Sequence, residues 1–283
     1  MIGAGILNQP YCFYKSGIFG ALAGFIVGIF GTWTGLLLMT EAGMANNILE
    51  FSDLAKLAMG VFGDKLVDFS VIFLAIGCMM GYIIVIGQTS SQVLGNWGCS
   101  DSICSQFNVT AVVTACIILP FCLLRTFGHL VPLAVFSVLA ILVCLFLVLI
   151  GGPIYTANTE KNPIIWFNLQ GSVISVGSIV LSLNCAFANF HAYEAVEDKS
   201  KNVKSWTRIT GGAVAVGALM LITMGLSGYL SFRDDTNGEI LSKLLLYQRI
   251  INSFLIIFLS IIHYYYFVTQ ITLKDISLIS SKR

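Results

Sequence analysis

The stretch IGAGILNQP, residues 2–10, decides how the rest of the chain is interpreted. Gly3, Gly5 and Pro10 each weaken a helix, glycine by about 1 kcal/mol and proline by about 3 kcal/mol relative to alanine. A helix over residues 1–15 would be about 22 Å long at about 1.5 Å per residue, which is too short to cross a bilayer alone. We therefore predict an interrupted first helix whose opening part is missing.

The composition indicates that this helix belongs to a membrane protein. Of the 283 residues, 57% are hydrophobic and 10% are charged, and the mean hydropathy is +0.89. Soluble domains are about half apolar and a quarter charged. About 20 apolar residues cross a bilayer, and seven such stretches follow: residues 16–40, 69–100, 102–124, 126–159, 162–193, 209–232 and 250–273. With the incomplete first helix, we predict an all-α polytopic membrane protein with about eight transmembrane helices.

The distribution of charges indicates how these helices are oriented. If the first helix runs outward, lysine and arginine are about twice as frequent in the inner loops as in the outer loops, in line with the positive-inside rule. Cys99 and Cys104 then lie in an outer loop. Because disulfides persist on that side of a membrane, we expect that these two cysteines can pair.

Glycines and an amphipathic pattern mark two packing elements. Gly20, Gly24 and Gly28 fall about one helical turn apart, which lets a neighbouring backbone approach closely. In residues 51–63, apolar side chains recur at helical spacing opposite Asp53 and Lys56. We predict a packing helix over residues 16–40 and a short interfacial helix over residues 51–63.

The apolar stretch over residues 162–193 carries the densest polar pattern. Four serines step by three, three and four residues and so share one helix face: Ser172, Ser175, Ser178 and Ser182. Such a stripe is either a substrate path or a helix contact, and we favour the contact because small polar residues hold membrane helices together. Asn184 follows the stripe, and an amide buried in hydrocarbon needs a partner.

The sequence offers little chemistry for catalysis or metal binding. The three histidines are far apart and have no cysteine or acidic partner at ligand spacing, and neither a GxxxxGK[ST] loop nor a GxSxG motif occurs. A net charge of +1 does not indicate a nucleic-acid surface. We predict a protein that is not an enzyme, has no cofactor and binds no nucleic acid.

Two interrupted helices, the first and the one over residues 162–193, stand five spans apart. In secondary transporters built from inverted repeats, helices at matching positions are broken near the middle of the membrane. The exposed backbone groups and half-helix ends at these breaks hold the substrate and the coupling ion. The pattern therefore favours a transporter that works by alternating access.

Three motifs resemble those of a known family. GAGILNQPYCFYKSG (residues 3–17) resembles the first-helix signature of the amino acid/auxin permease superfamily. SLNCAFANFHAYEAVEDKSKNVKSWTRIT (182–210) is similar to its sixth helix and the loop after it, and GYLSFRDDTNGEILS (228–242) to the exit of its seventh helix. The closest general likeness is to the sodium-coupled neutral amino acid transporters, and it covers about residues 1–242.

The resemblance implies a five-plus-five inverted-repeat fold of eleven helices, which this chain would hold incompletely. It implies cation-coupled transport of amino acids, small neutral ones among them, with Na⁺ or H⁺ as the coupling ion. The amino acid substrate would contact unwound backbone in the first helix, facing the break in the sixth helix. The implied substrate-binding residues are Ile2, Gly3, Ala4, Gly5, Ile6, Asn184, Cys185 and Ala186.

The chain departs from the family pattern at the sixth-helix break and at the residues that bind the ion. The family often has Cys-His at the sixth-helix break, where this chain has Cys185-Ala186. The asparagine that commonly precedes the glycines would lie before Met1, and the eighth helix with its hydroxyl ligands is not recognisable after Ser242. Sodium coupling and metal ligands therefore cannot be assigned from these residues.

Two regions and three functional alternatives follow. We expect an amino acid permease transmembrane domain over residues 1–242, truncated at its N-terminus, and a divergent tail over residues 243–283 with one transmembrane helix. We favour a transporter in the plasma membrane or an endolysosomal membrane, surrounded by lipid and with no protein partner indicated. The alternatives are a non-transporting amino-acid-binding sensor or accessory subunit, and an inactive fragment.

Overall fold

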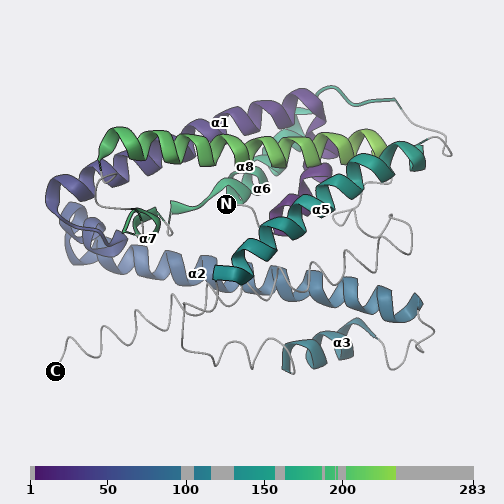
Figure 1. Cartoon of the computed structure of the whole chain (residues 1–283), viewed down its shortest axis with the longest axis horizontal. Helices are drawn as coiled ribbons and strands as arrows, with labels where there is room; N and C mark the ends of the chain where they lie inside the picture. The colour runs from purple at the N-terminus through teal and green to yellow at the C-terminus, as the bar shows by residue number, and fades with distance from the viewer. Residues whose placement is uncertain are drawn as a thin grey trace. The chain divides into compact units, whose positions relative to one another are not determined.

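The computed structural model describes residues 4–96, 105–115, 131–156, 163–186, 189–194, 196 and 202–233. These residues form a 3₁₀ helix, η1 (Ala4–Asn8), followed by α-helices (Figure 1). The α-helices are α1 (Gln9–Asn46), α2 (Phe51–Asn96), α3 (Gln106–Val113), α5 (Val131–Thr156), α6 (Leu169–Leu183), α7 (Asn189–Glu194) and α8 (Val203–Phe232). The expected tail at 243–283 lies outside the described residues.

Helix α1 combines the predicted first helix and the predicted packing helix. Gly17 separates them, since its φ of 74° and ψ of 168° are not helical. We predicted this boundary between residues 15 and 16, so the sequence located it to within two residues. The second part continues to Asn46, beyond the predicted end at residue 40, so its more polar last turns are helical as well. Asn47, with φ 55°, closes the helix.

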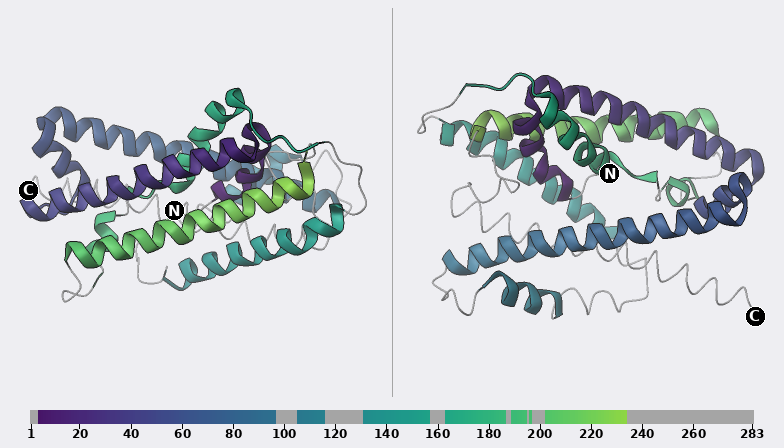
Figure 2. Two further views of the ribbon diagram at one scale, coloured as in Figure 1. Left: turned by 90° about the horizontal axis from the view of Figure 1, so that it is seen from above. Right: turned by 180° about the vertical axis from the view of Figure 1, so that it is seen from behind.

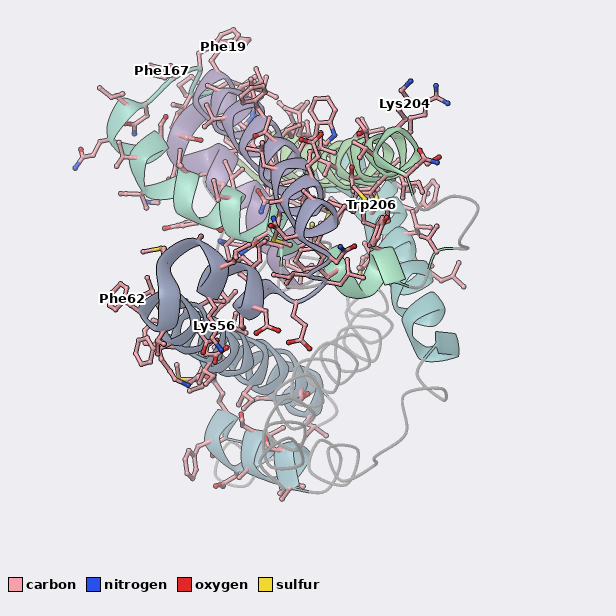
Figure 3. The ribbon with its side chains drawn as sticks, turned by 90° about the vertical axis from the view of Figure 1, so that its left-hand side faces the viewer. Phe19, Lys56, Phe62, Phe167, Lys204 and Trp206 are labelled. Atoms are coloured by element: carbon pink, nitrogen blue, oxygen red, sulfur yellow. The ribbon has the colours of Figure 1, made fainter. Side chains whose placement is uncertain are left out.

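Helix α2 contains a similar break at Gly60, with φ 69° and ψ −156°. The short segment before Gly60 matches the predicted interfacial helix, although that prediction ended at residue 63. Ser52 Oγ donates a 2.7 Å hydrogen bond to Asp68 Oδ1, which ties this segment to the helix beyond the break. Figure 3 shows Lys56 and Phe62, which lie on either side of Gly60.

The stretch predicted as one span over residues 162–193 is divided. It begins as an extended segment at residues 163–168, continues as α6, and reaches α7 after a non-helical interruption at Asn184 and Cys185. Helix α8 begins at Val203, six residues before the predicted start at 209. The Asn202 side chain caps it by accepting a 2.8 Å hydrogen bond from Ser205 N, so the charged residues of the first turns belong to the helix.

The chain divides into two units, residues 1–73 with 160–236 and residues 74–159 with 237–283. In the first unit, α1 lies beside α8 and α6 packs against α1 (Figures 1 and 2). Within α1, Gly24 and Gly28 face α6, and a Cβ at these positions would lie 3.1 Å from Ile179 Cδ1 and 2.9 Å from Leu183 Cδ1. This confirms the predicted close packing along the glycine row. The buried centre of the unit includes Phe13, Phe25, Ile179, Leu183, Leu221 and Met224.

The second unit contains the later part of α2 together with α3 and α5. Gly87 of α2 faces Thr110 of α3 with no room for a side chain. Helix α5 carries no charged residue and lies within the predicted span over residues 126–159.

Among the described residues, two helices are long and apolar enough to cross a membrane: Gly5–Asn46 and Val203–Phe232. The described part of the chain is all-helical apart from its connections. The predicted total of about eight transmembrane helices and the five-plus-five repeat stay predictions.

Candidate functional site

The first turns of the chain meet the last turns of α6 through the side chain of Gln9. Gln9 Nε2 donates one hydrogen bond to Gly5 O and another to Ser182 Oγ, each 2.9 Å long. Ser182 Oγ in turn donates to Ser178 O at 2.8 Å. A Cβ on Gly5 would overlap the Ser182 side chain, so only glycine allows this approach. The chain thereby joins the predicted break in the first helix to the end of α6.

The orientation of the Gln9 amide follows from these bonds. A backbone carbonyl can only accept, so the group that faces Gly5 O must be Nε2. Both hydrogens of that nitrogen are used, and Oε1 points elsewhere. Gln9 is fully buried, and its Oε1 has no hydrogen-bond partner among the described residues. An unpaired buried acceptor costs about 1–3 kcal/mol.

The serine stripe of α6 makes further bonds to the same part of the chain. Asn8 Nδ2 donates to Ser178 Oγ at 2.8 Å, and Ser175 Oγ donates to Cys12 O at 3.2 Å. These contacts confirm the prediction that the stripe joins two helices. The same Cys12 carbonyl accepts a second hydrogen bond, from Ser16 Oγ at 2.6 Å.

The break after α6 has a local cause. Asn184 is extended, with φ −69° and ψ 128°, and its Oδ1 accepts a 3.1 Å hydrogen bond from Ala186 N. This turn gives the backbone an alternative to the next helical bond, as asparagine commonly does. The predicted partner of the Asn184 amide is therefore the adjacent backbone. Asn184, Cys185 and Ala186 are half-buried.

The extended segment at residues 163–168 leads into the start of α6 (Figure 2). It pairs with the backbone around Gly17: Asn168 N donates to Ser16 O at 2.8 Å, and Phe19 N donates to Trp166 O at 3.0 Å. Tyr229 of α8 holds the same segment, since its hydroxyl accepts from Ile165 N at 2.8 Å. Phe19 and Phe167 lie together in Figure 3.

Helix α7 follows the break after α6. Asn189 Nδ2 donates a buried 2.7 Å hydrogen bond to Thr40 Oγ1 of α1, and the Tyr193 hydroxyl donates to Met44 Sδ at 3.0 Å. The Tyr193 ring meets the Trp206 ring edge-on, with centroids 5.2 Å apart. Trp206 turns toward α7, whereas Lys204 points away from the helices (Figure 3). Helix α7 is thus held by α1 and α8 and separated from α6 by the break.

The structure brings together only part of the predicted site. Gly5 lies against Ser182 in the last turn of α6, and Ser182 precedes Asn184 by two residues. The expectation of unwound backbone is wrong for Ala4, Gly5 and Ile6, which are wound into η1 because the tighter 3₁₀ pattern still forms local hydrogen bonds there. Ile2 and Gly3 lie outside the described residues, as do Cys99 and Cys104.

Sequence reasoning missed Gln9. The signal was present, because an amide in an otherwise apolar stretch four residues after Gly5 falls on the same helical face as that glycine. Among the described residues, no group of three or more His, Cys, Asp or Glu side chains could hold a metal ion.

Comparison with known proteins identifies the relatives of this chain. The family described as transmembrane amino acid transporter protein matches residues 1–272. Vacuolar amino acid transporter 2 of Saccharomyces cerevisiae is 25% identical over 252 residues, which are 86% of this chain and 52% of the relative. Amino acid transporter AVT3B of Arabidopsis thaliana is 26% identical over 256 residues, 86% of this chain and 60% of the relative. No solved structure matches the chain.

A further relative is solute carrier family 38 member 10 of Homo sapiens, 22% identical over 251 residues, which are 85% of this chain and 22% of that protein. This chain therefore spans about half the length of the yeast relative and less of the human one. The names of all three relatives describe transporters or solute carriers and no enzyme.

Proposed function

We propose that this chain, which belongs to the transmembrane amino acid transporter protein family, moves amino acids across a membrane by alternating access. The observation that supports this most is that η1, at the start of the chain, meets the last turn of α6 just before the break at Asn184 and Cys185. In transporters of this general kind, a break in such a helix supplies free backbone groups to a substrate.

We propose that the substrate lies beside the junction of η1 and α6, at the break that follows α6. Its contacts there would be Ile2, Gly3, Ala4, Gly5 and Ile6 on one side and Asn184, Cys185 and Ala186 on the other. The break leaves Cys185 half-buried, between a helix that packs on α1 and a short helix held separately by Thr40. This arrangement would let α7 and α6 move with respect to each other during transport.

The substrates that fit best are small neutral amino acids. No described acidic or basic side chain makes a hydrogen bond to Gly5, Gln9 or Ser182, so this part offers neutral polar groups only. We propose Na⁺ or H⁺ as the coupling ion and place the protein in the plasma membrane or an endolysosomal membrane. Three of the matched relatives, two from Saccharomyces cerevisiae and one from Schizosaccharomyces pombe, are named for the vacuole.

Uptake by the full chain in proteoliposomes tests this function. We expect radiolabelled L-alanine to accumulate above its external concentration under a sodium gradient or a proton gradient, and not in liposomes without protein. The two gradients are applied separately and identify the ion. Binding of L-alanine without any uptake would instead support the non-transporting sensor.

A further inference from the structure

Gln9 joins η1 to α6 through its amide nitrogen, and its amide oxygen is left for another partner. Its two amide hydrogens hold Gly5 O and Ser182 Oγ, so its nitrogen is committed to the structure of the site. Its Oε1 is buried and has no partner among the described residues. A buried acceptor without a donor is uncommon in folded proteins and calls for an explanation.

We infer that Gln9 Oε1 receives the α-ammonium group of the amino acid and makes Gln9 a specificity-determining residue. This rests on the proposed function, since it concerns how the same site recognises its substrate. The amide bridges η1 and the last turn of α6, beside which the substrate is proposed to lie. An ammonium N–H supplies the one interaction that this oxygen lacks.

An alkali cation fits the surroundings less well than an ammonium group. Such a cation is held by several oxygen ligands at once, whereas each of the three N–H donors of an ammonium group is satisfied by one acceptor, and Oε1 would accept one of them. The two oxygens to which the Gln9 amide is bonded, Gly5 O and Ser182 Oγ, already accept hydrogens from its nitrogen. Only Oε1 has both lone pairs unused, and hydrogen bonds between a charged donor and a neutral acceptor are among the stronger ones.

The inference predicts discrimination against ligands that lack the amine. Matched pairs test it: L-alanine with propionate, L-valine with isovalerate, and L-leucine with isocaproate. Affinity is measured from the ligand-dependent rise in Tm of the full chain in lipid nanodiscs. We expect each wild-type preference for the amino acid to be about tenfold or more, and the Gln9→Leu variant to reduce it toward unity.

Two further variants separate recognition from folding. Gln9→Glu keeps an acceptor oxygen, so it should retain the preference for the amino acid even if it is less stable. Asn8→Leu removes the neighbouring amide bond to Ser178 and leaves Gln9 intact. We expect this control to lower Tm without changing the preference. If Gln9 only held η1 against α6, loss of the Asn8 bond between the same two elements should reduce the preference as well.

The outcomes distinguish this inference from the proposed function. If no amino acid of the three raises the Tm of the wild-type protein, the proposed function fails and the inference with it. If the amino acid and its partner acid bind equally, or if Gln9→Leu keeps the preference, the function stands and the role of Gln9 is wrong. Stabilisation by NaCl over choline chloride that disappears in Gln9→Leu would assign Oε1 to sodium instead.

Discussion

Gly17 is the residue at which α1 changes direction, and its conformation suits glycine alone. Its φ of 74° with ψ of 168° lies in a region that other residues rarely adopt. A Cβ would also lie 2.7 Å from Phe167 N, where the extended segment before α6 crosses it. The close approach allows the hydrogen bonds from Asn168 to Ser16 and from Phe19 to Trp166.

We therefore expect Gly17→Ala to destabilise the protein by about 1–3 kcal/mol, the usual cost of such backbone strain. The measurement is Tm of the detergent-purified chain, followed by tryptophan fluorescence. Gly31→Ala is the matched control, because Gly31 lies in the same helix, is helical and has open space around it. Equal Tm values for the two variants would contradict the role given to Gly17.

At this scale the sequence predicted positions better than roles. The start of the charge-free stretch after Lys15 placed a boundary within two residues of Gly17, and the resemblance to the permease superfamily implied the break near Asn184. The sequence did not predict that Gln9 would join η1 to the last turn of α6, because residues 173 positions apart in sequence meet only once the helices pack. Nor did it predict that Asn184 would satisfy itself through Ala186.

Among the elements, the contact between α1 and α6 positions the site. The glycine row of α1 lets α6 approach closely, and the serine face of α6 then reaches Asn8, Gln9 and Cys12. Both patterns were readable because helical spacing alone puts their members on one face. The sequence did not predict that the glycine face of α1 packs against the serine face of α6, since several helices carry small residues.

We expect Gly24→Leu to separate α1 from α6. Its Cβ would lie 3.1 Å from Ile179 Cδ1, so the remaining side-chain carbons have no space, and overpacking typically costs about 1–3 kcal/mol. Tm of the purified variant measures the loss. Gly35→Leu introduces the same side chain in the same helix where nothing lies within 4 Å. A Gly24 variant as stable as this control would show that the packing of the row does not matter.

For the whole molecule, the sequence was sufficient for the family and for an all-helical membrane class. Composition and apolar stretches of bilayer length predicted the class, and the match over residues 1–272 agrees with the resemblance found in three motifs. The number of helices and the repeat were not decided, because they depend on how apolar stretches pair in space. The chain spans 52% of the yeast relative and 60% of the plant relative, so the substrate and the transport cycle are proposals.

The central claim is that an amino acid binds in the intact protein where η1 meets the end of α6. Protection of Cys185 from alkylation tests it most directly, because this half-buried thiol lies in the break while Cys12 and Cys144 are buried. The full chain in liposomes is treated with N-ethylmaleimide, and mass spectrometry of its peptides follows each cysteine separately. We expect L-alanine to slow the modification of Cys185 severalfold and propionate to leave it unchanged. Equal rates at Cys185 with and without L-alanine, in protein that accumulates L-alanine, would contradict this position of the site.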